Sequence, residues 1–213
     1  MRRKSFDVIV STGGLLLTLV LVAAGALLFW GYSYANNTVS AQLTAQQVTF
    51  PPQSAFAHAR PGGEVTPQMT PYLERYAGEK LTTGAQAEAY ANHFIAYHLA
   101  EMPYGGVYAK VSAAAHLAPA GTAQGAQLAS LEQTVFQGTS LRGMLLNAYG
   151  WWQIGQIALI GSIVSFILAA LTLVLSGLGL WHFRRVPVDE EIPRLRTATG
   201  FGQGGQPMAN AGL

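Results

Sequence analysis

Cysteine is absent from the 213-residue sequence, and charged residues are scarce. A chain without cysteine cannot form a disulfide, a thiolate nucleophile or a cysteine-ligated metal centre, and the absence suits an oxidising exterior. Only 10% of the residues are charged, whereas 50% are hydrophobic. Such a composition leaves room for one modest domain beside membrane segments, and we expect no nucleic-acid partner because the basic residues gather beside apolar runs.

Charge is missing altogether from the stretch between Ile154 and Trp181, around which the rest of the chain is organised. As a helix it would span roughly 42 Å at about 1.5 Å per residue, which exceeds the ~30 Å hydrocarbon core of a bilayer. A second uncharged stretch runs from Val8 to Gly31. The two stretches predict two transmembrane helices, with the lipid bilayer as the first partner of the chain.

Basic residues flank both apolar stretches. Arg2, Arg3 and Lys4 precede the first stretch, and Arg184 and Arg185 follow the second. Under the positive-inside rule both termini are cytoplasmic, and the segment between the spans lies outside a cell (plasma) membrane that the chain crosses twice. A cleaved signal peptide is the alternative, but the first apolar run is longer than the apolar region of about 7–15 residues in a signal peptide.

These features predict an all-α membrane protein in which two antiparallel transmembrane helices carry an extracytoplasmic domain of about four short helices that caps them. The expected parts are a cytoplasmic N-terminus (1–7), transmembrane helix 1 (8–34), the extracytoplasmic domain (35–150), transmembrane helix 2 (151–182) and a disordered cytoplasmic tail (183–213). Tryptophan and tyrosine favour the membrane interface. We expect Trp30, Tyr32, Tyr34, Tyr149, Trp151 and Trp152 at the outer interface and Trp181 at the inner one.

Proline and glycine divide the extracytoplasmic domain into short helices. After Pro51 and Pro52 we expect a loop as far as Gly63. The patterns then predict a short helix that begins at Thr66 or Thr70 and ends before Gly78, a helix from Gly84 to Met102 capped by Thr83, a helix from Val107 to Leu117, and one from Gln124 to Phe136 that stops near Gly138. Ser140 is expected to cap a further helix that continues unbroken into the second span.

Two sets of side chains on these helices need partners. The helix from Gly84 to Met102 has an apolar stripe made of Ala87, Ala91, Phe94, Ile95, His98 and Met102. In the spans, small residues allow helices to approach each other closely. The candidates are Gly161, Ser165 and Ala169 in the second span and Gly14, Thr18 and Ala26 in the first, which either pack within the chain or mediate self-association.

The candidate metal ligands outside the spans are His58, His93, His98 and His116, with Glu88 and Glu101 nearby in sequence. His98 and Glu101 can share a helix face, whereas His93 and His98 are about 140° apart around a helix. There is no H-E-x-x-H motif, and a site of two histidines and one carboxylate would need a histidine from elsewhere. We therefore expect no metal, no cofactor and no catalytic residue, with His98 at the edge of the core and the other histidines in solvent.

Two other features each have a functional interpretation and a purely structural one. The stretch from Gly200 to Gly205 matches G-x-G-x-x-G, but it lies in a glycine-rich tail rather than between a strand and a helix. Arg142 lies just outside the second span and either binds a lipid phosphate or a partner's carboxylate, or extends to the interface as a snorkelling side chain. No side chain inside the two uncharged stretches, 8–31 and 154–181, is ionisable, which counts against a pump or a proton-coupled transporter.

Four stretches carry a resemblance to known proteins: SAQLTAQQVTFP after the first span, AYANHFIAYHLAEM, GGVYAKVSAAA, and QTVFQGTSLRGMLLNAYGWW before the second span. On these stretches, which cover much of residues 40–182, the chain resembles an actinobacterial family of two-span membrane proteins without an assigned function. Some members carry the label of aromatic-ring-opening dioxygenase, an activity whose iron ligands are not matched here residue by residue. The resemblance implies the two-span architecture and the membrane location.

Three classes of function remain open from the sequence. The first is a non-enzymatic accessory or scaffold component of a cell-envelope or respiratory membrane assembly, either as a homo-oligomer or within a larger membrane complex. The second is a membrane-anchored binding module for a lipid or a small amphipathic ligand, and an enzyme is the third. An apolar helical groove would serve either of the first two functions, so the sequence does not separate them.

Overall fold

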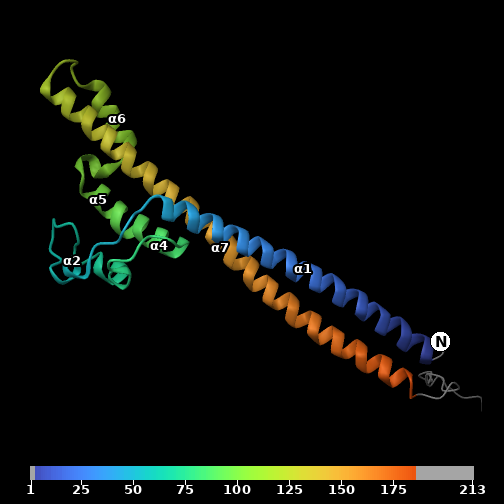
Figure 1. Cartoon of the computed structure of the whole chain (residues 1–213). Helices are drawn as coiled ribbons and strands as arrows, with labels where there is room; N and C mark the ends of the chain where they lie inside the picture. Colours follow the sequence, from blue (N-terminus) through green and yellow to red (C-terminus); the bar gives the residue numbers. More distant parts are fainter. Residues whose placement is uncertain (1–2, 186–213) are drawn as a thin grey trace, which may run out of the picture. The chain divides into compact units, whose positions relative to one another are not determined.

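The computed structural model describes residues 3–185, and within them the chain is helical and has no β-strand (Figure 1). Two of the helices, α1 (Arg3–Ala45) and α7 (Ala123–Phe183), are long and apolar enough to cross a membrane. The predicted all-helical fold with two long apolar helices is therefore confirmed. The predictions for residues 186–213, including the Gly200–Gly205 motif, lie outside the described residues.

The chain between α1 and α7, residues 46–122, forms a set of short helices that we call the cap. In chain order these are α2 (Gln53–Ala57), α3 (Thr70–Leu73), η1 (Glu74–Tyr76), α4 (Gly84–Ala89), η2 (Tyr90–Ile95), α5 (Ala96–Glu101), η3 (Pro103–Gly106) and α6 (Tyr108–Leu117). Elements η1 and η3 are 3-10 turns, and η2 is a π-helical segment. An isolated bridge joins Thr49 to Lys80.

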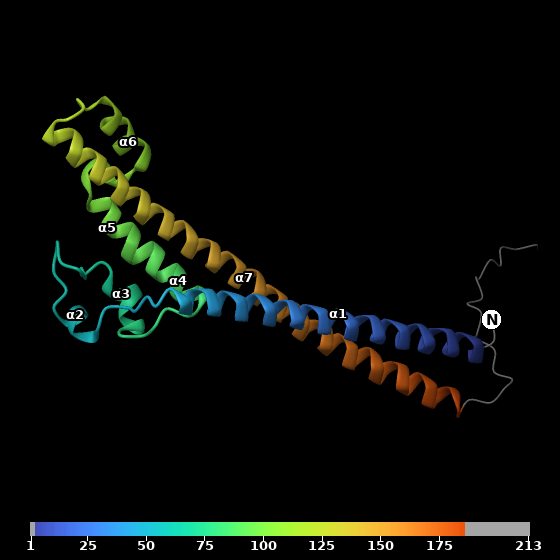
Figure 2. The same ribbon diagram turned by 45° about the horizontal axis from the view of Figure 1, so that its top comes forward.

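Contacts divide the described residues into two units. The smaller unit joins the beginning of α1, up to residue 18, to the end of α7, from residue 170. The larger unit, residues 19–169, contains the remainder of both long helices and the cap. Within it, α4 and α5 lie alongside α7, and α6 lies beside the beginning of α7 (Figure 1 and Figure 2).

In the smaller unit the two long helices meet through small and hydroxyl side chains. The Thr18 hydroxyl donates a hydrogen bond to the Gly14 carbonyl and lies 2.9 Å from the Thr172 hydroxyl. Gly14 packs directly against Ser176. Small residues let two helix backbones approach closely. The prediction that Gly14 and Thr18 are packing residues within the chain is therefore confirmed.

In the larger unit the two helices pack in the same way. The Ser162 hydroxyl donates a 2.9 Å hydrogen bond to the Gly25 carbonyl. A Cβ on Gly161 would lie 3.2 Å from Leu28, so this predicted small residue is also at the contact. Ala26, in contrast, is exposed, and the prediction that it faces the partner helix is wrong because its neighbour Gly25 occupies that position.

Buried positions recur every seven residues along both long helices. On α1 they are Ser11, Thr18, Gly25 and Val39, with the half-buried Tyr32 at the intervening position of the repeat, and on α7 they are Gly155, Ser162, Ala169 and Ser176. A seven-residue repeat keeps one face of a helix toward its partner in left-handed packing. The predicted series with a four-residue spacing includes only one of these α7 positions, Ala169, while Gly161 and Ser165 are half-buried.

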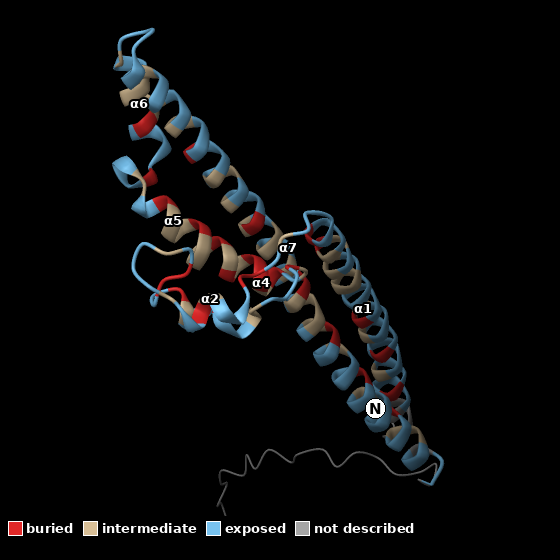
Figure 3. Ribbon diagram, turned by 60° about the vertical axis from the view of Figure 1, so that its left-hand side comes forward, coloured by how far each residue is buried: buried red, intermediate tan, exposed pale blue. Residues whose placement is uncertain are grey.

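The cap has a core of larger apolar side chains, and the buried positions of the ribbon are red in Figure 3. Its buried members are Phe50, Phe56, Val65, Met69, Leu73, Leu81, Ile95 and Leu99, which pack with Val39 and Leu43 of α1 and Leu145 of α7. The cap and the adjoining ends of the long helices therefore share one hydrophobic core.

The predicted N-cap at Thr83 is confirmed. The Thr83 hydroxyl accepts a 3.3 Å hydrogen bond from the backbone N–H of Gln86, and the Gln86 side-chain oxygen accepts a 3.0 Å bond from the N–H of Thr83. The Gln86 amide nitrogen also donates to Glu79. This reciprocal pair is a capping box, and it fixes the beginning of α4. Only its threonine was predicted from the sequence.

The helical run from Gly84 to Glu101 is continuous, as predicted, although η2 widens it to a π-helix in the middle. Of the predicted apolar stripe, Ala87, Ala91 and Ile95 are buried, and Phe94, His98 and Met102 are half-buried. The predicted stop is also confirmed at η3, where a Cβ on Gly106 would overlap the Leu99 carbonyl. Beyond it, α6 agrees with the predicted Val107–Leu117 helix, with Val107 as its N-cap.

The predicted break at Gly138 and the predicted cap at Ser140 are wrong, because α7 passes both residues without interruption. Glycine costs only about 1 kcal/mol relative to alanine inside a helix. A Cβ on Gly138 would lie 2.8 Å from Leu99, so this glycine makes room for the neighbouring helix rather than ending its own. The predicted unbroken helix from Leu141 into the second span is confirmed.

Two details between residues 51 and 78 differ from the predictions. The stretch expected to be a loop contains α2, which places Phe56 in the core. Helix α3 begins at Thr70 after the N-cap Met69, so neither Thr66 nor Thr70 caps it. The predicted glycine beyond this short helical segment is confirmed, because Gly78 follows η1 with a φ of +70°.

Candidate ligand groove

A groove of about 880 Å³ lies between α1 and α7 in the larger unit. It extends along α1 from Gly31 to Gln46 and along α7 from Leu141 to Ala158. Sites for small molecules typically have volumes of about 300–1,000 Å³ and mainly apolar linings. The groove therefore has the size of a ligand site, and it is built from two segments that lie far apart in the sequence.

The floor of the groove is formed where the two helices touch. A Cβ on Gly155 would lie 3.3 Å from the Cβ of Ala35, so the backbones approach closely at this point. Val39 and Leu145, which line the groove farther along, are nearly fully buried. Gly31 differs from these residues because no atom lies within 4 Å of the position where its Cβ would be. Space therefore remains open above Gly31.

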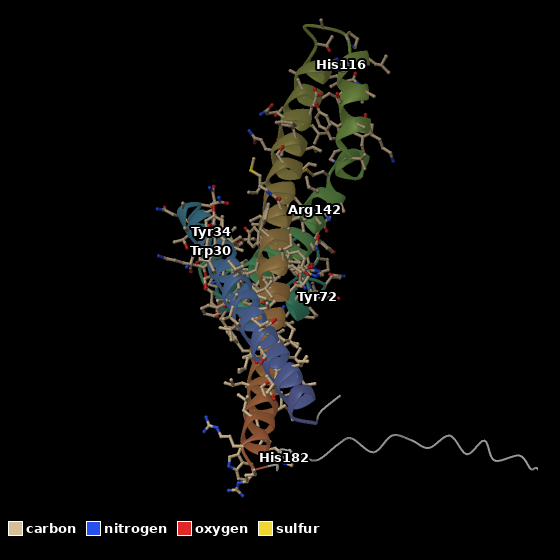
Figure 4. All side chains as sticks on the ribbon, turned by 90° about the vertical axis from the view of Figure 1, so that its right-hand side faces the viewer. Trp30, Tyr34, Tyr72, His116, Arg142 and His182 are labelled. Carbon is tan, nitrogen blue, oxygen red and sulfur yellow. The ribbon has the colours of Figure 1, made fainter. Side chains whose placement is uncertain are left out.

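Large apolar and aromatic side chains form the walls. Tyr34, Met144, Trp151 and Ile154 line the groove, and each of them is exposed. The ring of Tyr34 stacks on Trp30 at 5.8 Å between centroids, and both residues lie on α1 in Figure 4. Exposed apolar walls around an open volume present a surface that water does not stabilise.

The aromatic residues predicted for the outer interface separate into two groups. Trp30, Tyr34 and Trp151 are exposed, whereas Tyr32, Tyr149 and Trp152 are half-buried. Trp152 lies directly against Gly84 at the beginning of α4, where a Cβ would overlap it. Trp152 therefore joins α7 to the cap, and Tyr34 and Trp151 line the groove.

Polar groups of the groove gather near the end formed by Gln46. Gln42 lies there on α1, Gln46 directly follows the end of α1, and Asn147 lies on α7. All three side chains are exposed uncharged amides. The groove lining contains no Asp, Glu, Lys, Arg or His, and Tyr34 is its one titratable side chain. The arrangement can bind an apolar molecule and offer hydrogen bonds at one end.

Arg142 contacts the cap. One of its terminal nitrogens, Nη2, donates a 3.0 Å hydrogen bond to the Asn92 side-chain oxygen in η2, and the Asn92 amide nitrogen donates to Glu88 at 2.9 Å. Arg142 is half-buried, and its Nε makes no hydrogen bond to a described residue (Figure 4). The sequence predicted that Arg142 either contacts a lipid or a partner or snorkels to the interface. Neither prediction included this link between α7 and η2.

The four histidines outside the spans lie apart from each other along the cap. His58 and His98 each contact the backbone carbonyl four residues earlier through Nδ1, at 2.8 Å. His93 stacks on Tyr72 with centroids 3.6 Å apart and is half-buried, so the expectation that it lies in solvent is wrong. His116 is exposed on α6. Within residues 3–185 no three His, Asp or Glu side chains are grouped to hold a metal ion.

A row of aromatic rings crosses the cap core. Phe50 lies 5.1 Å from Tyr76 and 5.3 Å from Tyr90 between ring centroids, and Tyr90 continues to Phe94 at 4.7 Å. Burial raises the pKa of the Tyr90 hydroxyl above its usual value of about 10, and the negative charge of Glu64 adds to the rise. Tyr90 is therefore neutral at physiological pH, and its ring acts as a packing element.

A smaller cavity of about 280 Å³ lies in the smaller unit. Ser11, Gly14, Ser176, Gly179 and His182 contribute to its lining. It is smaller than the groove, and Val10 and Leu175 add apolar surface to its lining.

No protein-family model, no curated protein and no solved structure matches this chain.

Proposed function

We propose that the chain is a membrane-anchored binding protein that holds the apolar part of a small amphipathic molecule in the groove between α1 and α7. The open volume over Gly31, walled by exposed apolar and aromatic side chains, is the observation that carries this proposal. The lining offers hydrogen-bonding amides but no acid, base or nucleophile other than the Tyr34 hydroxyl and the Thr38 hydroxyl. Binding without catalysis is the role that such a lining supports.

Membrane placement supports the same proposal. Large apolar side chains cover the outside of both long helices, and basic residues lie at the ends where both helices meet the termini. In a plasma membrane with both termini cytoplasmic, the cap is extracytoplasmic. The groove then begins beside the exposed pair Trp30 and Tyr34, at the outer surface of the bilayer.

The binding role is tested by blocking the groove. The full chain purified in mild detergent should retain about one equivalent of a small amphipathic molecule, detected by mass spectrometry of a solvent extract. Gly31→Leu should remove it, because the new side chain points into the open volume. Gly150→Leu is the matched control, since Gly150 is also a helical glycine with nothing within 4 Å but does not line the groove. Equal retention by both variants would refute the proposal.

Topology is tested in the cysteine-free chain with single cysteines at Ser5, Ala120 and Ala209. In intact cells an impermeant maleimide should label position 120 and leave positions 5 and 209 unlabelled. Labelling at position 209 in intact cells would contradict two spans with both termini inside.

A role in a larger assembly is the second candidate, and a patch on the cap favours it. Val107 at the N-cap of α6, Tyr108 and Leu117 on α6, and Phe136 on α7 are all exposed, and the rings of Tyr108 and Phe136 lie 5.7 Å apart. Exposed apolar surface is typical of sites that bind a protein or a membrane. A homo-oligomer or a partner protein that remains bound in mild detergent, and is lost on Leu117→Glu, would support this role.

A further inference from the structure

We infer that the molecule held in the groove is a single-chain lipid with an uncharged hydroxyl- or amide-bearing head, bound with its head near Gln42 and Asn147 and its chain directed toward Gly31. This inference rests on the proposed binding function and specifies the ligand. Three observations carry it: the position of the amides, the absence of charge from the lining, and the length of the groove.

The register of the two helices places the amides together. Gly161 lies against Leu28 and Gly155 lies against Ala35, so the helices run in opposite directions past each other. Continuing this register along the groove brings Asn147 level with Gln42, one helical turn from Gln46. The amides of the lining are therefore at one end, the Thr38 hydroxyl lies between the ends, and the opposite end around Gly31 and Ala158 has the Tyr34 hydroxyl as its polar group.

The chemistry of this polar end selects an uncharged head. A side-chain amide provides two donors and an acceptor, which suits a hydroxyl or an amide that both donates and accepts. A phosphate, in contrast, is usually held by Arg or Lys or by the backbone N–H groups of a helix N-terminus. The lining contains no Arg or Lys, and the neighbouring Arg142 is turned to Asn92 of the cap. A phosphate at this end would therefore find no positive charge in the lining to pair with.

The length of the groove fits one lipid chain with its head. From Gly31 to Gln46 the α1 backbone rises by about 22 Å, and one leaflet of a bilayer with its head groups measures roughly 20 Å. The volume of about 880 Å³ is that of a single small-molecule site. If the Gly31 end meets the outer leaflet, a lipid enters chain last and keeps the orientation that it has in that leaflet.

The test compares two probes that share one acyl chain. Radiolabelled 1-oleoylglycerol has two free hydroxyls, whereas 1-oleoyl lysophosphatidic acid replaces one of them with a phosphate. The full chain in detergent micelles should bind the glycerol lipid about tenfold more tightly, because lysophosphatidic acid replaces a hydroxyl that the amides can bind with a charge that the lining does not pair. Gln42→Lys should reverse the preference, since it places a cation at the exposed head position without changing the core.

The outcomes separate the ligand class from the binding function. Equal or tighter binding of the phosphate lipid to the natural chain, lost on Gly31→Leu but not on Gly150→Leu, would overturn the uncharged head and leave the binding function standing. If neither lipid binds, or if Gly31→Leu binds both as well as the natural chain does, the binding function itself fails. An unchanged preference in Gln42→Lys would show that the head does not lie at Gln42, and would overturn the proposed orientation.

Discussion

The cap and the paired long helices bury side chains of opposite size. In the cap, large side chains such as Phe50, Met69 and Leu73 point inward and are nearly inaccessible. Along the helix pair the inward positions hold small residues such as Gly25 and Ser162, and the large apolar residues point outward. The cap therefore buries its large apolar side chains, whereas the helix pair exposes them.

The difference agrees with the surroundings proposed for each region. A core of large inward side chains gains stability from removing apolar surface from water. Helices surrounded by lipid gain little from hiding apolar surface, so their contacts depend on close backbone approach and interhelical hydrogen bonds. The contrast supports placing the helix pair in a membrane and the cap in water, with the groove at the junction between them.

The largest expected effect is the loss of an inward side chain of the cap. Phe50→Ala removes a ring that packs on Tyr76 and Tyr90, and it should lower the free energy of unfolding by about 3–5 kcal/mol. Leu19→Ala, on the outside of α1, should leave the stability nearly unchanged in detergent because the Leu19 side chain is 68% exposed. Thermal unfolding followed by near-ultraviolet circular dichroism measures both variants.

Equal losses of stability in these two variants would contradict the comparison between inward and outward packing. A large loss for Leu19→Ala alone would mean that this surface of α1 is covered by a tightly packed partner in the purified protein. The assembly role would then gain support over a lipid-exposed helix.

A somewhat smaller effect is expected at the contact between the cap and α7. In Gly84→Ala the new Cβ would overlap Trp152 near its backbone, where the side chain cannot move aside. Overpacking of this kind costs about 1–3 kcal/mol. Gly143→Ala is the control, because that position on α7 has no atom within 4 Å, and the change should stabilise its helix by up to about 1 kcal/mol. Comparable melting temperatures of the two variants would show that the contact between Gly84 and Trp152 is loose.

Glycine shows how much of the fold the sequence could predict. The end of the helix near Gly106 was predictable because Pro103 and Gly105 precede this glycine. Several helix-breaking residues together strongly favour a helix end. Gly138 stands without a proline or a second glycine beside it, and its role depends on Leu99 of another helix. A single sequence does not show that neighbour, so the same residue type predicted a stop where the structure has a contact.

The groove is less predictable than the helices for a related reason. Its hydrophobic residues and its position near the aromatic residues follow from the sequence, which is why an apolar groove was a reasonable hypothesis. Its shape depends on the register of α1 against α7, and this register is set by pairs such as Ala35 with Gly155. Likewise, the bond from Arg142 to Asn92 joins residues that only the folded chain brings together.

A smaller, pH-dependent effect is expected within the cap. Because the pKa of Tyr90 is raised by burial and by Glu64, the folded cap favours the neutral phenol more than the unfolded chain does. This contribution to stability is fully present below the unfolded pKa of about 10 and is lost as the pH rises through the folded pKa. Tyr90→Phe should weaken this alkaline loss of stability, and Glu64→Gln should reduce the shift of the Tyr90 pKa. Absorbance titration of the phenolate together with melting at several pH values measures both, and a Tyr90 that ionises at its ordinary pKa would contradict the burial argument.

The smallest expected effect is the loss of one hydroxyl between the long helices, and it tests the other side of the comparison. Ser162→Ala removes the hydrogen bond to the Gly25 carbonyl but keeps a small side chain at the seam. Interhelical hydrogen bonds in membranes contribute on average about 0.6 kcal/mol, because alternative partners exist when the helices separate. Ser162→Leu also removes the hydroxyl, and its larger side chain forces the two backbones apart. It should therefore lower the stability more than Ser162→Ala does. Both are measured by thermal unfolding in the same detergent. If the alanine variant lost as much stability as the leucine variant, the hydroxyl rather than the size of the side chain would hold the helices together, and close approach through small residues would have to be abandoned as the basis of the pair.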